Sequence, residues 1–250
     1  MRVNQLEILG GQDRDGRPEP LASLRLRPGL TVAVVGPTGS GKSQLLSDIE
    51  QLARGDTPSG RRVLLDGAQI DAPPTGLVAT LSQRTNFVMD ASVAKFIELH
   101  AACLDKSGGD WAERVLSLAN TLCGEAFGGD SPLQGLSGGQ TRALMIADLA
   151  LISDAPVVLI DEVENAGIDK HRALAALAGH GKIVLTATHD PVLMLMNDLR
   201  VVMAGGAMQQ AIAIDDDERL ARQRLAELDA TLLRARDLLR QGARLEKDSL

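Results

Sequence analysis

The sequence predicts an α/β fold with a mostly parallel core sheet, an N-terminal antiparallel β subdomain and an inserted helical subdomain. Three observations predict it. Short, almost wholly apolar runs recur along the chain, as expected of strands that are covered on both faces. The first of these runs, Thr31–Val35, leads directly into a glycine-rich segment and then a helix. Between the strand runs, residues 85–135 change to the apolar spacing of helices.

Composition limits the class of protein to which the chain can belong. Its 250 residues can hold one large domain or two small ones, and 44% hydrophobic residues suit a globular core. The formal net charge of −7 argues against a nucleic-acid partner, which would need a basic face. Because no apolar run of about 18 residues occurs, we expect no membrane-spanning helix. Cys103 and Cys123 lack metal-ligand spacing and are expected to be reduced, small apolar residues within helices.

The N-terminal part begins with strands. Two short antiparallel strands are expected near Val3–Leu9 and Leu21–Arg27, around a loop rich in Gly, Asp and Pro. The apolar run Thr31–Val35 then predicts a buried strand. A helix is expected to follow from Lys42 to about Ala53.

The later strand signals lie on both sides of the helical insertion. The further buried-strand candidates are Arg62–Leu65, Leu77–Leu81, Val157–Ile160 and Ile183–Thr186. Near the end of the core, Val201–Met203 and Met208–Ile212 flank Gly205-Gly206, which predicts a hairpin turn.

The helical subdomain is expected over residues 85–135. Its first helix begins behind Ser92 as a possible N-cap. A second helix begins at Asp110, which with Glu113 resembles a capping box. The apolar stripes are Val93, Phe96, Ile97, His100 and Leu104 in the first helix and Trp111, Val115, Leu118 and Leu122 in the second. This insertion divides the core domain, residues 1–212, into 1–84 and 136–212.

Residues 213–250 predict a long amphipathic helix. The acidic run 215–218 suits a helix N-terminus. Leucines recur behind it at a/d-like spacing, at Leu225, Leu228, Leu232 and Leu239. Such a helix either packs on its own domain or serves as a dimerising or partner-binding helix.

The glycine-rich segment Gly36–Ser43 reads G-x(4)-G-K-S between a buried strand and a helix, the context of a phosphate-binding loop. Its glycines let backbone N–H groups converge on phosphate oxygens without a Cβ in the way. The following helix directs its N-terminal partial charge at the anion. Lys42 would reach the β- and γ-phosphates, and the Ser43 hydroxyl would bind Mg²⁺. The residues expected to bind nucleotide here are Gly36, Pro37, Thr38, Gly39, Ser40, Gly41, Lys42 and Ser43.

Two adjacent carboxylates, Asp161 and Glu162, end an apolar strand. Such a pair at the carboxyl edge of a parallel sheet is costly unless a cation or a reaction uses it. We expect Asp161 to hold Mg²⁺ and Glu162 to orient and polarise the attacking water as the catalytic residue.

The order of these motifs resembles that of the ATP-binding cassette (ABC) ATPases, a branch of the P-loop NTPases, over about residues 1–212. Residues 136–140, Leu-Ser-Gly-Gly-Gln, match the signature of that family. The resemblance implies that the signature binds the γ-phosphate of ATP held by the opposite protomer, chiefly through its Ser and second Gly. The signature residues expected at the nucleotide are Ser137, Gly138, Gly139 and Gln140.

Three single residues extend the resemblance. Gln83 matches the glutamine loop, which is implied to sense Mg²⁺ and the γ-phosphate and to lead into the helical subdomain. Asp169 occupies the place of the D-loop aspartate at the nucleotide interface. His189 follows the strand Ile183–Thr186 and matches the switch histidine, a catalytic residue that contacts the γ-phosphate.

The chain departs from the family pattern at three places. Residues 1–35 contain no aromatic residue to stack on adenine, so either Arg14 or Arg17 stacks on the base or the base is held loosely. Glu164 adds charge after the catalytic carboxylates, where protomers should meet. Asp148 stands on the helix after the signature, where the family often has Arg.

The resemblance implies an Mg²⁺-dependent ATPase that works as a nucleotide-sandwiched dimer, most simply a homodimer because every motif is present in one chain. The leading interpretation is the cytoplasmic energising subunit of an ABC transporter, bound at the inner membrane face to a separate membrane-spanning subunit. The alternative is a soluble ATPase that drives assembly or activation of a metalloprotein or cofactor system and acts on a soluble client complex. A binding-only regulator is disfavoured because such a protein could lose Glu162 or His189.

Overall fold

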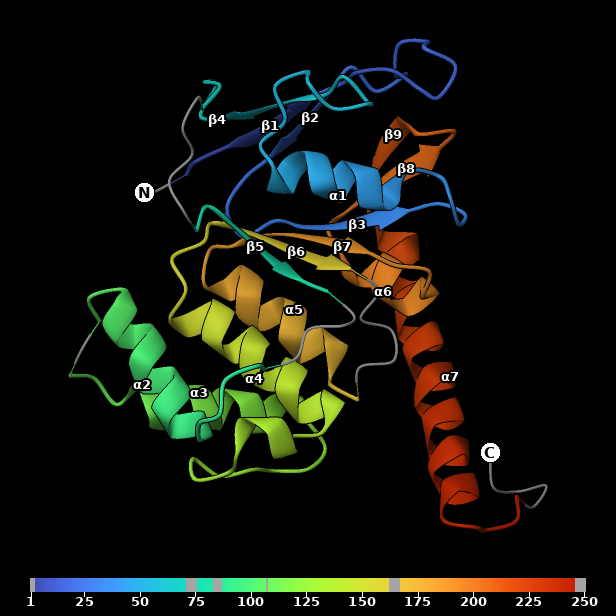
Figure 1. Ribbon diagram of the computed structural model, residues 1–250. Coiled ribbons are helices and arrows are strands. Elements are labelled where there is room, and N and C mark those ends of the chain that lie inside the picture. The colour runs from blue at the N-terminus through green and yellow to red at the C-terminus, as the bar shows by residue number, and fades with distance from the viewer. Residues whose placement is uncertain (1–2, 71–75, 83–86, 107, 162–166, 246–250) are drawn as a thin grey trace.

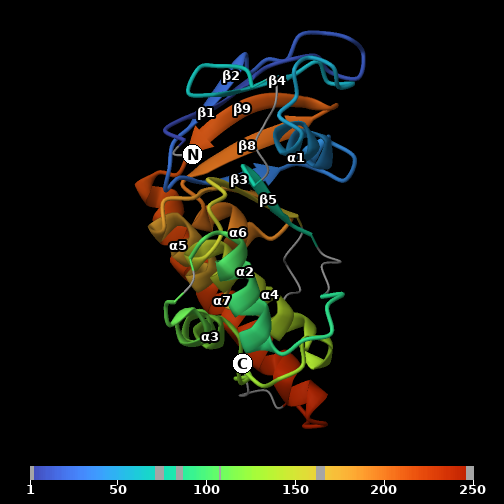
Figure 2. The same cartoon turned by 60° about the vertical axis from the view of Figure 1, so that its left-hand side comes forward.

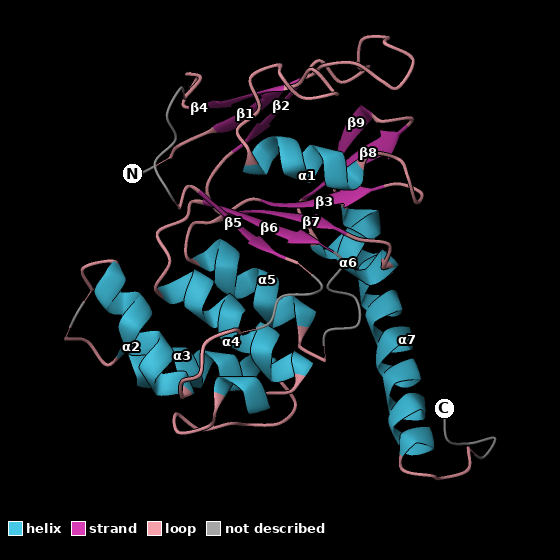
Figure 3. Ribbon diagram, in the orientation of Figure 1, coloured by secondary structure: helices cyan, strands magenta, loops and turns pink. Residues whose placement is uncertain are grey.

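The computed structural model describes residues 3–70, 76–82, 87–106, 108–161 and 167–245. Two β-sheets lie one above the other, with the helix α1 (Lys42–Glu50) between them (Figure 1). A second set of helices covers the opposite face of the larger sheet. Figure 3 shows how the strands gather with α1 in the upper part of the molecule, while the other helices lie below the larger sheet or extend downward from it.

The larger sheet has six strands in the order β5-β6-β7-β3-β8-β9. All neighbours are parallel except β8 and β9, which are antiparallel. The strands are β3 (Thr31–Val35), β5 (Val78–Leu81), β6 (Val157–Asp161), β7 (Ile183–Ala187), β8 (Leu199–Ala204) and β9 (Ala207–Ala213). The apolar runs at β3, β6 and β7 are buried almost throughout, which agrees with strands covered on both faces.

The smaller sheet is antiparallel and has the order β2-β1-β4. Its strands are β1 (Leu6–Leu9), β2 (Ser23–Leu26) and β4 (Arg62–Leu65). The sequence predicted the first pair, and the third strand was predicted as buried without assignment to this sheet. Ile8 lies opposite both Leu24 and Val63, and all three side chains are buried against α1 and the core sheet.

The helix α1 ends at Glu50, a turn earlier than the predicted Ala53. Leu52 takes a positive φ of 50°, and the Ala53 N–H donates to the Asp48 carbonyl at 2.8 Å. This is the hydrogen bond of a Schellman ending, which closes a helix with one left-handed residue. Leu52 and Ala53 are buried, so their apolar character continues the core but not the helix.

Helices on the other face of the core sheet build the second half of the molecule. They are α4 (Gly138–Leu151), α5 (Lys170–Gly179) and α6 (Pro191–Met196). The helical insertion supplies α2 (Val93–Cys103) and α3 (Trp111–Leu122), which pack on one another and on α4 (Figure 2). A short 3-10 helix, Leu133–Gly135, precedes α4.

The predicted helix starts differ in their capping. The Ser92 hydroxyl accepts a hydrogen bond from the Lys95 N–H, as predicted. Asp110 stands at the N-cap of α3, but its side chain accepts no capping hydrogen bond, so the predicted capping box is wrong. The cysteines also differ from expectation, because Cys103 is exposed at the end of α2 and Cys123 lies just after α3.

The C-terminal helix α7 (Asp216–Arg240) runs away from the core sheet (Figure 1). Its beginning packs on α6 and is tied to β8 by an ion pair of 2.6 Å between Arg200 and Glu218. Leu228, Leu232 and Leu239 stay more than half exposed. The start of α7 therefore packs on its own domain while much of its leucine stripe faces outward. None of the helices that the structure describes is long and apolar enough to cross a membrane.

Candidate nucleotide site

The predicted site residues converge because three parallel strands end at one edge of the core sheet. Val34 of β3 lies opposite Ala187 of β7, and Ala187 lies opposite Asp161 of β6. The phosphate loop follows β3 and His189 follows β7, so both begin at the same level as Asp161. In parallel sheets, ligands bind in the crevice outside these carboxyl ends.

The β8–β9 hairpin packs so closely on the loop that two loop positions, 36 and 41, have no room for a side chain. A Cβ on Gly36 would lie 2.4 Å from the Met203 carbonyl oxygen. A Cβ on Gly41 would lie 2.9 Å from the Gly206 Cα, and Gly41 has a φ of 103°. Any side chain at either position would displace backbone. The exposed residues Pro37, Thr38 and Gly39 form the outer part of the loop.

The ammonium of Lys42 lies inside this loop and contacts His189. Its Nζ donates to the carbonyls of Gly36 at 2.9 Å and Pro37 at 3.3 Å. The same Nζ lies 3.0 Å from Nε2 of His189. Lys42 is buried, so a cation is held at the centre of the loop, where phosphate charge can be neutralised.

Oxygen donors for a metal ion stand at two points around Lys42. Ser43 is exposed at the start of α1, and Asp161 is half-buried at the end of β6. Mg²⁺ is usually held by one or two protein oxygens together with phosphate oxygens and waters. The donor set therefore fits Mg²⁺ that arrives with a nucleotide. Gln83 and Glu162, predicted as a metal sensor and as the water-orienting base, lie outside the described residues.

The signature residues form the first turn of α4. The Ser137 hydroxyl accepts from the Gln140 N–H at 3.3 Å, and the Gln140 carboxamide oxygen accepts from the Ser137 N–H at 2.9 Å. This reciprocal pair is a capping box, which leaves Gly138 and Gly139 as the first two helical residues. Without side chains, these glycines expose the positive end of the helix to an anion.

Asp169 stands at the start of the neighbouring helix, α5. Its carboxylate accepts from the Arg172 N–H at 3.0 Å and so caps α5, while its own N–H donates to the Leu122 carbonyl at 2.7 Å. Gly167, two residues earlier, packs beside the signature, since a Cβ on it would lie 3.7 Å from the Gly139 Cα. The signature and Asp169 thus lie on helices below the core sheet, whereas α1 with Lys42 lies above it (Figure 1).

Of the two arginines considered for the base, only Arg14 reaches the phosphate loop. Its guanidinium donates to the Gly39 carbonyl, and its N–H donates to the Gly205 carbonyl at 3.0 Å. Arg17 pairs instead with Asp15 at 3.4 Å, where both side chains are exposed. Arg14 is therefore the planar cation at the edge of the loop.

Asp148, which departs from the family pattern, has a partner in the helical insertion. Its buried carboxylate lies 2.8 Å from Nδ1 of His100 on α2. This hydrogen bond raises the pKa of His100 above its ordinary value. The pair ties α2 to the signature helix, a role that an Arg at position 148 would not fill.

Sequence reasoning missed Lys170. Its ammonium lies 2.5 Å from the carboxylate of Asp190, the residue after His189. Asp190 also caps α6 by accepting from the Val192 N–H at 2.8 Å. The only signal for this pair in the sequence was the position of each residue directly after a motif residue, Asp169 or His189.

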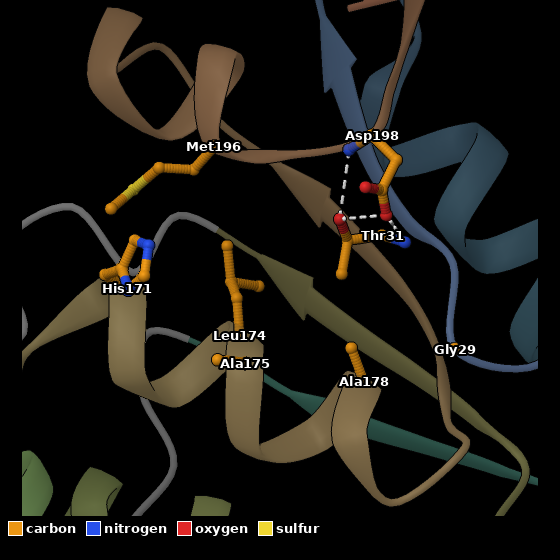
Figure 4. A pocket seen from close by; sticks show the side chains of 8 residues that line it. All are labelled: Gly29, Thr31, His171, Leu174, Ala175, Ala178, Met196 and Asp198. Carbon is orange, nitrogen blue, oxygen red and sulfur yellow. Dashed lines mark hydrogen bonds between the residues drawn. The ribbon is translucent and has the colours of Figure 1, made fainter. Parts of the chain in front are cut away.

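A cavity of about 210 Å³ lies at the other edge of the core sheet. Thr31, the first residue of β3, and Asp198 stand on one side of it, and α5 on the other (Figure 4). Asp198 accepts two hydrogen bonds of 2.9 Å from the N–H and the hydroxyl of Thr31. Because the phosphate loop follows the last residue of β3, this cavity is separate from the nucleotide site.

Comparison with known sequences agrees with these motifs. The family model described as ABC transporter matches residues 21–165. The chain is 48% identical to an ABC transporter ATP-binding protein of Methanocaldococcus jannaschii, covering 100% of this chain and 98% of that protein. It is 34% identical over 181 residues to the macrolide export ATP-binding/permease protein MacB of Rhodospirillum rubrum, of which it covers 27%. These comparisons give no support to the alternative role in metalloprotein assembly.

Solved structures agree on the fold. CbiO1 of Clostridium perfringens, part of the ABC transporter complex CbiONQ, has a TM-score of 0.62 at 21% identity, covering 92% of this chain and 96% of that one. A dimeric ATP-binding cassette in a post-hydrolysis state with ADP and phosphate has a TM-score of 0.59 at 20% identity, covering 84% of this chain and 99% of that one. The chain belongs to the ABC transporter family and is one of its ATP-hydrolysing ATP-binding cassettes.

Proposed function

We propose that the chain is the energising subunit of an ABC transporter and works as a homodimer with ATP between its protomers. One observation carries the dimer: the phosphate loop leads into α1 on one face of the core sheet, while the signature begins α4 on the other face (Figure 1). A nucleotide on the loop is therefore out of reach of the signature in the same chain. A second copy facing the first would bring its signature to that nucleotide.

Within one protomer, the loop Gly36–Ser43 holds the phosphates of ATP. Lys42 exchanges its carbonyl and histidine partners for the β- and γ-phosphate oxygens. Ser43 and Asp161 would hold Mg²⁺, with Gln83 as its predicted sensor, and the bound ion would supply positive charge to neutralise the phosphates.

Hydrolysis needs a water in line with the bond to the γ-phosphate. Glu162 orients and polarises that water. His189, which already lies beside Lys42, contacts the γ-phosphate and so senses whether that phosphate is bound. From the facing protomer, Ser137 and Gly139 close over the same phosphate, and Asp169 lines the interface between the two chains.

The membrane partner is a separate polypeptide. The relative from Methanocaldococcus jannaschii is named as the ATP-binding protein of a transporter, and MacB as an ATP-binding/permease protein. By analogy, this chain sits on the cytoplasmic face of a membrane, where ATP is available, and drives translocating helices carried by another chain.

The dimer is tested with Glu162→Gln, which keeps the site but removes the base. The variant should bind ATP, hydrolyse it at less than about 1% of the wild-type rate, and elute as a dimer only with ATP. Lys42→Ala is the control and should stay monomeric with ATP because it loses phosphate binding. A Glu162→Gln protein that remains monomeric at saturating ATP would contradict the dimer.

The transporter role is tested by affinity purification of the tagged chain from native membranes in mild detergent. Recovery of a polytopic membrane protein in a stable ratio supports the role. Recovery of only soluble metalloenzyme components would overturn it without affecting the assignment as an ATPase.

A further inference from the structure

A fully buried cluster of charges lies behind the phosphate loop and takes no part in the proposed hydrolysis. Its centre is the guanidinium of Arg61, whose side chain has no exposed surface. Nη1 lies 2.9 Å from the Asp48 carboxylate, and Nε lies 3.1 and 3.2 Å from the two carboxylate oxygens of Glu19. Both carboxylates are equally buried. Burial of three charges is expensive unless their geometry has a use.

The remaining polar atoms of the cluster are also partnered. Asp48 accepts from the Ser59 hydroxyl at 2.7 Å and from the Gln44 carboxamide at 2.9 Å. Glu19 accepts from the N–H groups of Met208 at 2.8 Å and Gly11 at 3.0 Å. A satisfied network of this kind is rigid, because each side chain is fixed by several bonds.

The cluster joins elements that are far apart in the chain. Glu19 lies in the loop before β2, Asp48 lies on α1, and Arg61 directly precedes β4. Asp48 therefore connects Arg61 to the same helix whose first residues are Lys42 and Ser43.

Arg61 also reaches the loop from behind. Its Nη2 donates to the Gly206 carbonyl at 2.6 Å, and the Gly206 N–H donates to the Ser40 carbonyl at 2.9 Å. The Gly206 Cα is also the atom that a Cβ on Gly41 would meet at 2.9 Å. The hairpin turn at Gly206 therefore packs directly behind the phosphate loop, and the Arg61 guanidinium is hydrogen-bonded to this turn.

We propose that Arg61 is a positioning residue for ATP binding, acting through Gly206 on the loop and through Asp48 on α1. The planar fork of arginine suits this task because it bonds three groups at fixed angles, whereas a lysine ammonium is a point charge on a flexible stem. The inference rests on the proposed function in that residues 36–43 hold the phosphates.

The test is Arg61→Lys, which keeps the charge and loses the fork. The variant should remain folded and bind ATP about tenfold more weakly, because the charged hydrogen bond from position 61 to the Gly206 carbonyl no longer fixes the hairpin turn behind the loop. KM for ATP should rise to a similar extent with kcat within about twofold, since the loss affects ground state and transition state alike. Arg200→Lys is the matched control: it disturbs the ion pair with Glu218 away from the loop and should leave both constants unchanged.

A second variant covers the case in which Arg61→Lys does not fold. Arg61→Met with Glu19→Gln leaves one buried carboxylate and so keeps the net charge of the cluster at one negative. It should show at least the same loss of ATP affinity by titration with a fluorescent nucleotide. A folded variant of either kind with wild-type ATP affinity overturns the inference.

Lys42→Ala separates this failure from failure of the proposed site. If Lys42→Ala loses ATP binding and Arg61→Lys does not, only the positioning role is wrong. If Lys42→Ala binds ATP like the wild type, the phosphates do not lie on the loop, and both proposals fall.

Discussion

The ammonium of Lys42 lies 3.0 Å from Nε2 of His189, although the two residues are 147 positions apart in the chain. An ammonium can only donate, so this contact requires a lone pair on Nε2. With the carbonyls of Gly36 and Pro37, the histidine gives Lys42 one partner for each of its three protons. A nucleotide that binds Lys42 must therefore replace at least one of these partners, and His189 is the one outside the phosphate loop, just after β7.

His189→Ala should separate binding from hydrolysis. ATP affinity should change little because the loop and Lys42 remain, while kcat should fall by about a hundredfold with the loss of a γ-phosphate contact. Phosphate release and nucleotide titration measure the two effects. His180→Ala, on the exposed end of α5, is the control and should leave both at wild-type values. Equal losses of affinity and rate would show that His189 serves binding alone.

Ser137→Ala tests whether the signature acts on a partner chain. The substitution removes the cap of α4 and should cost about 1 kcal/mol of stability. Ser92→Ala removes a cap of the same kind from α2 and should cost a similar amount. Only Ser137→Ala should also abolish ATP hydrolysis.

The same variant supports a mixing experiment. A heterodimer of Ser137→Ala with Lys42→Ala contains one composite site in which both residues are intact. The mixture should therefore hydrolyse ATP although neither variant does so alone. Absence of activity in a mixture that demonstrably forms heterodimers would mean that the two residues do not share a site across the interface.

The ion pair between Lys170 and Asp190 should contribute to stability, because it joins the start of α5 to the residue that caps α6. Lys170→Met and Asp190→Asn each remove the pair and should each cost about 1 kcal/mol in urea unfolding. Asp190→Ala should cost about 1 kcal/mol more, because it also removes the cap of α6. Lys95→Met, in an exposed pair of 4.0 Å, should change stability very little. An equal cost for Asp190→Ala and Asp190→Asn would contradict the capping role.

Stability should depend on pH through His100. The hydrogen bond that His100 donates to the Asp148 carboxylate raises the pKa of the histidine above its ordinary value of 6.5. Burial and the charge of Lys106 lower this pKa, and the charge of Asp154 raises it, each to a smaller extent. Protonation therefore favours the folded chain. The contribution is fully present below pH 6.5 and is lost as the pH rises through the higher folded pKa.

Thermal unfolding at a series of pH values measures this effect. The wild type should lose stability as the pH rises above 6.5 and through the raised pKa of His100, relative to Asp148→Asn, which cannot accept the charged hydrogen bond in the same way. His180→Gln is the control for histidine titration elsewhere on the chain. Parallel curves for wild type and Asp148→Asn would exclude the pair as the cause.

Local signals in the sequence determined most individual elements. The strand Thr31–Val35 has the predicted bounds, because an apolar run ending in a glycine-rich turn has few other solutions. The hairpin around Gly205 and Gly206 also agrees, since both residues take the positive φ that a two-residue turn requires. The order of the motifs was sufficient to predict the ABC family, and the similarity to known ABC sequences confirms that prediction.

Only the tertiary structure decided which distant residues meet. No local pattern pairs Arg61 with Glu19, His100 with Asp148, or β4 with β1, because each contact depends on sheet order and helix packing. The sequence was also compatible with a C-terminal helix that packs on its own domain or one that binds a partner. In the structure α7 packs on α6, while Leu228 and Leu232 remain exposed. The periodicity of apolar residues determines which face of a helix or strand is buried. Which other element packs against that face depends on the fold of the whole chain.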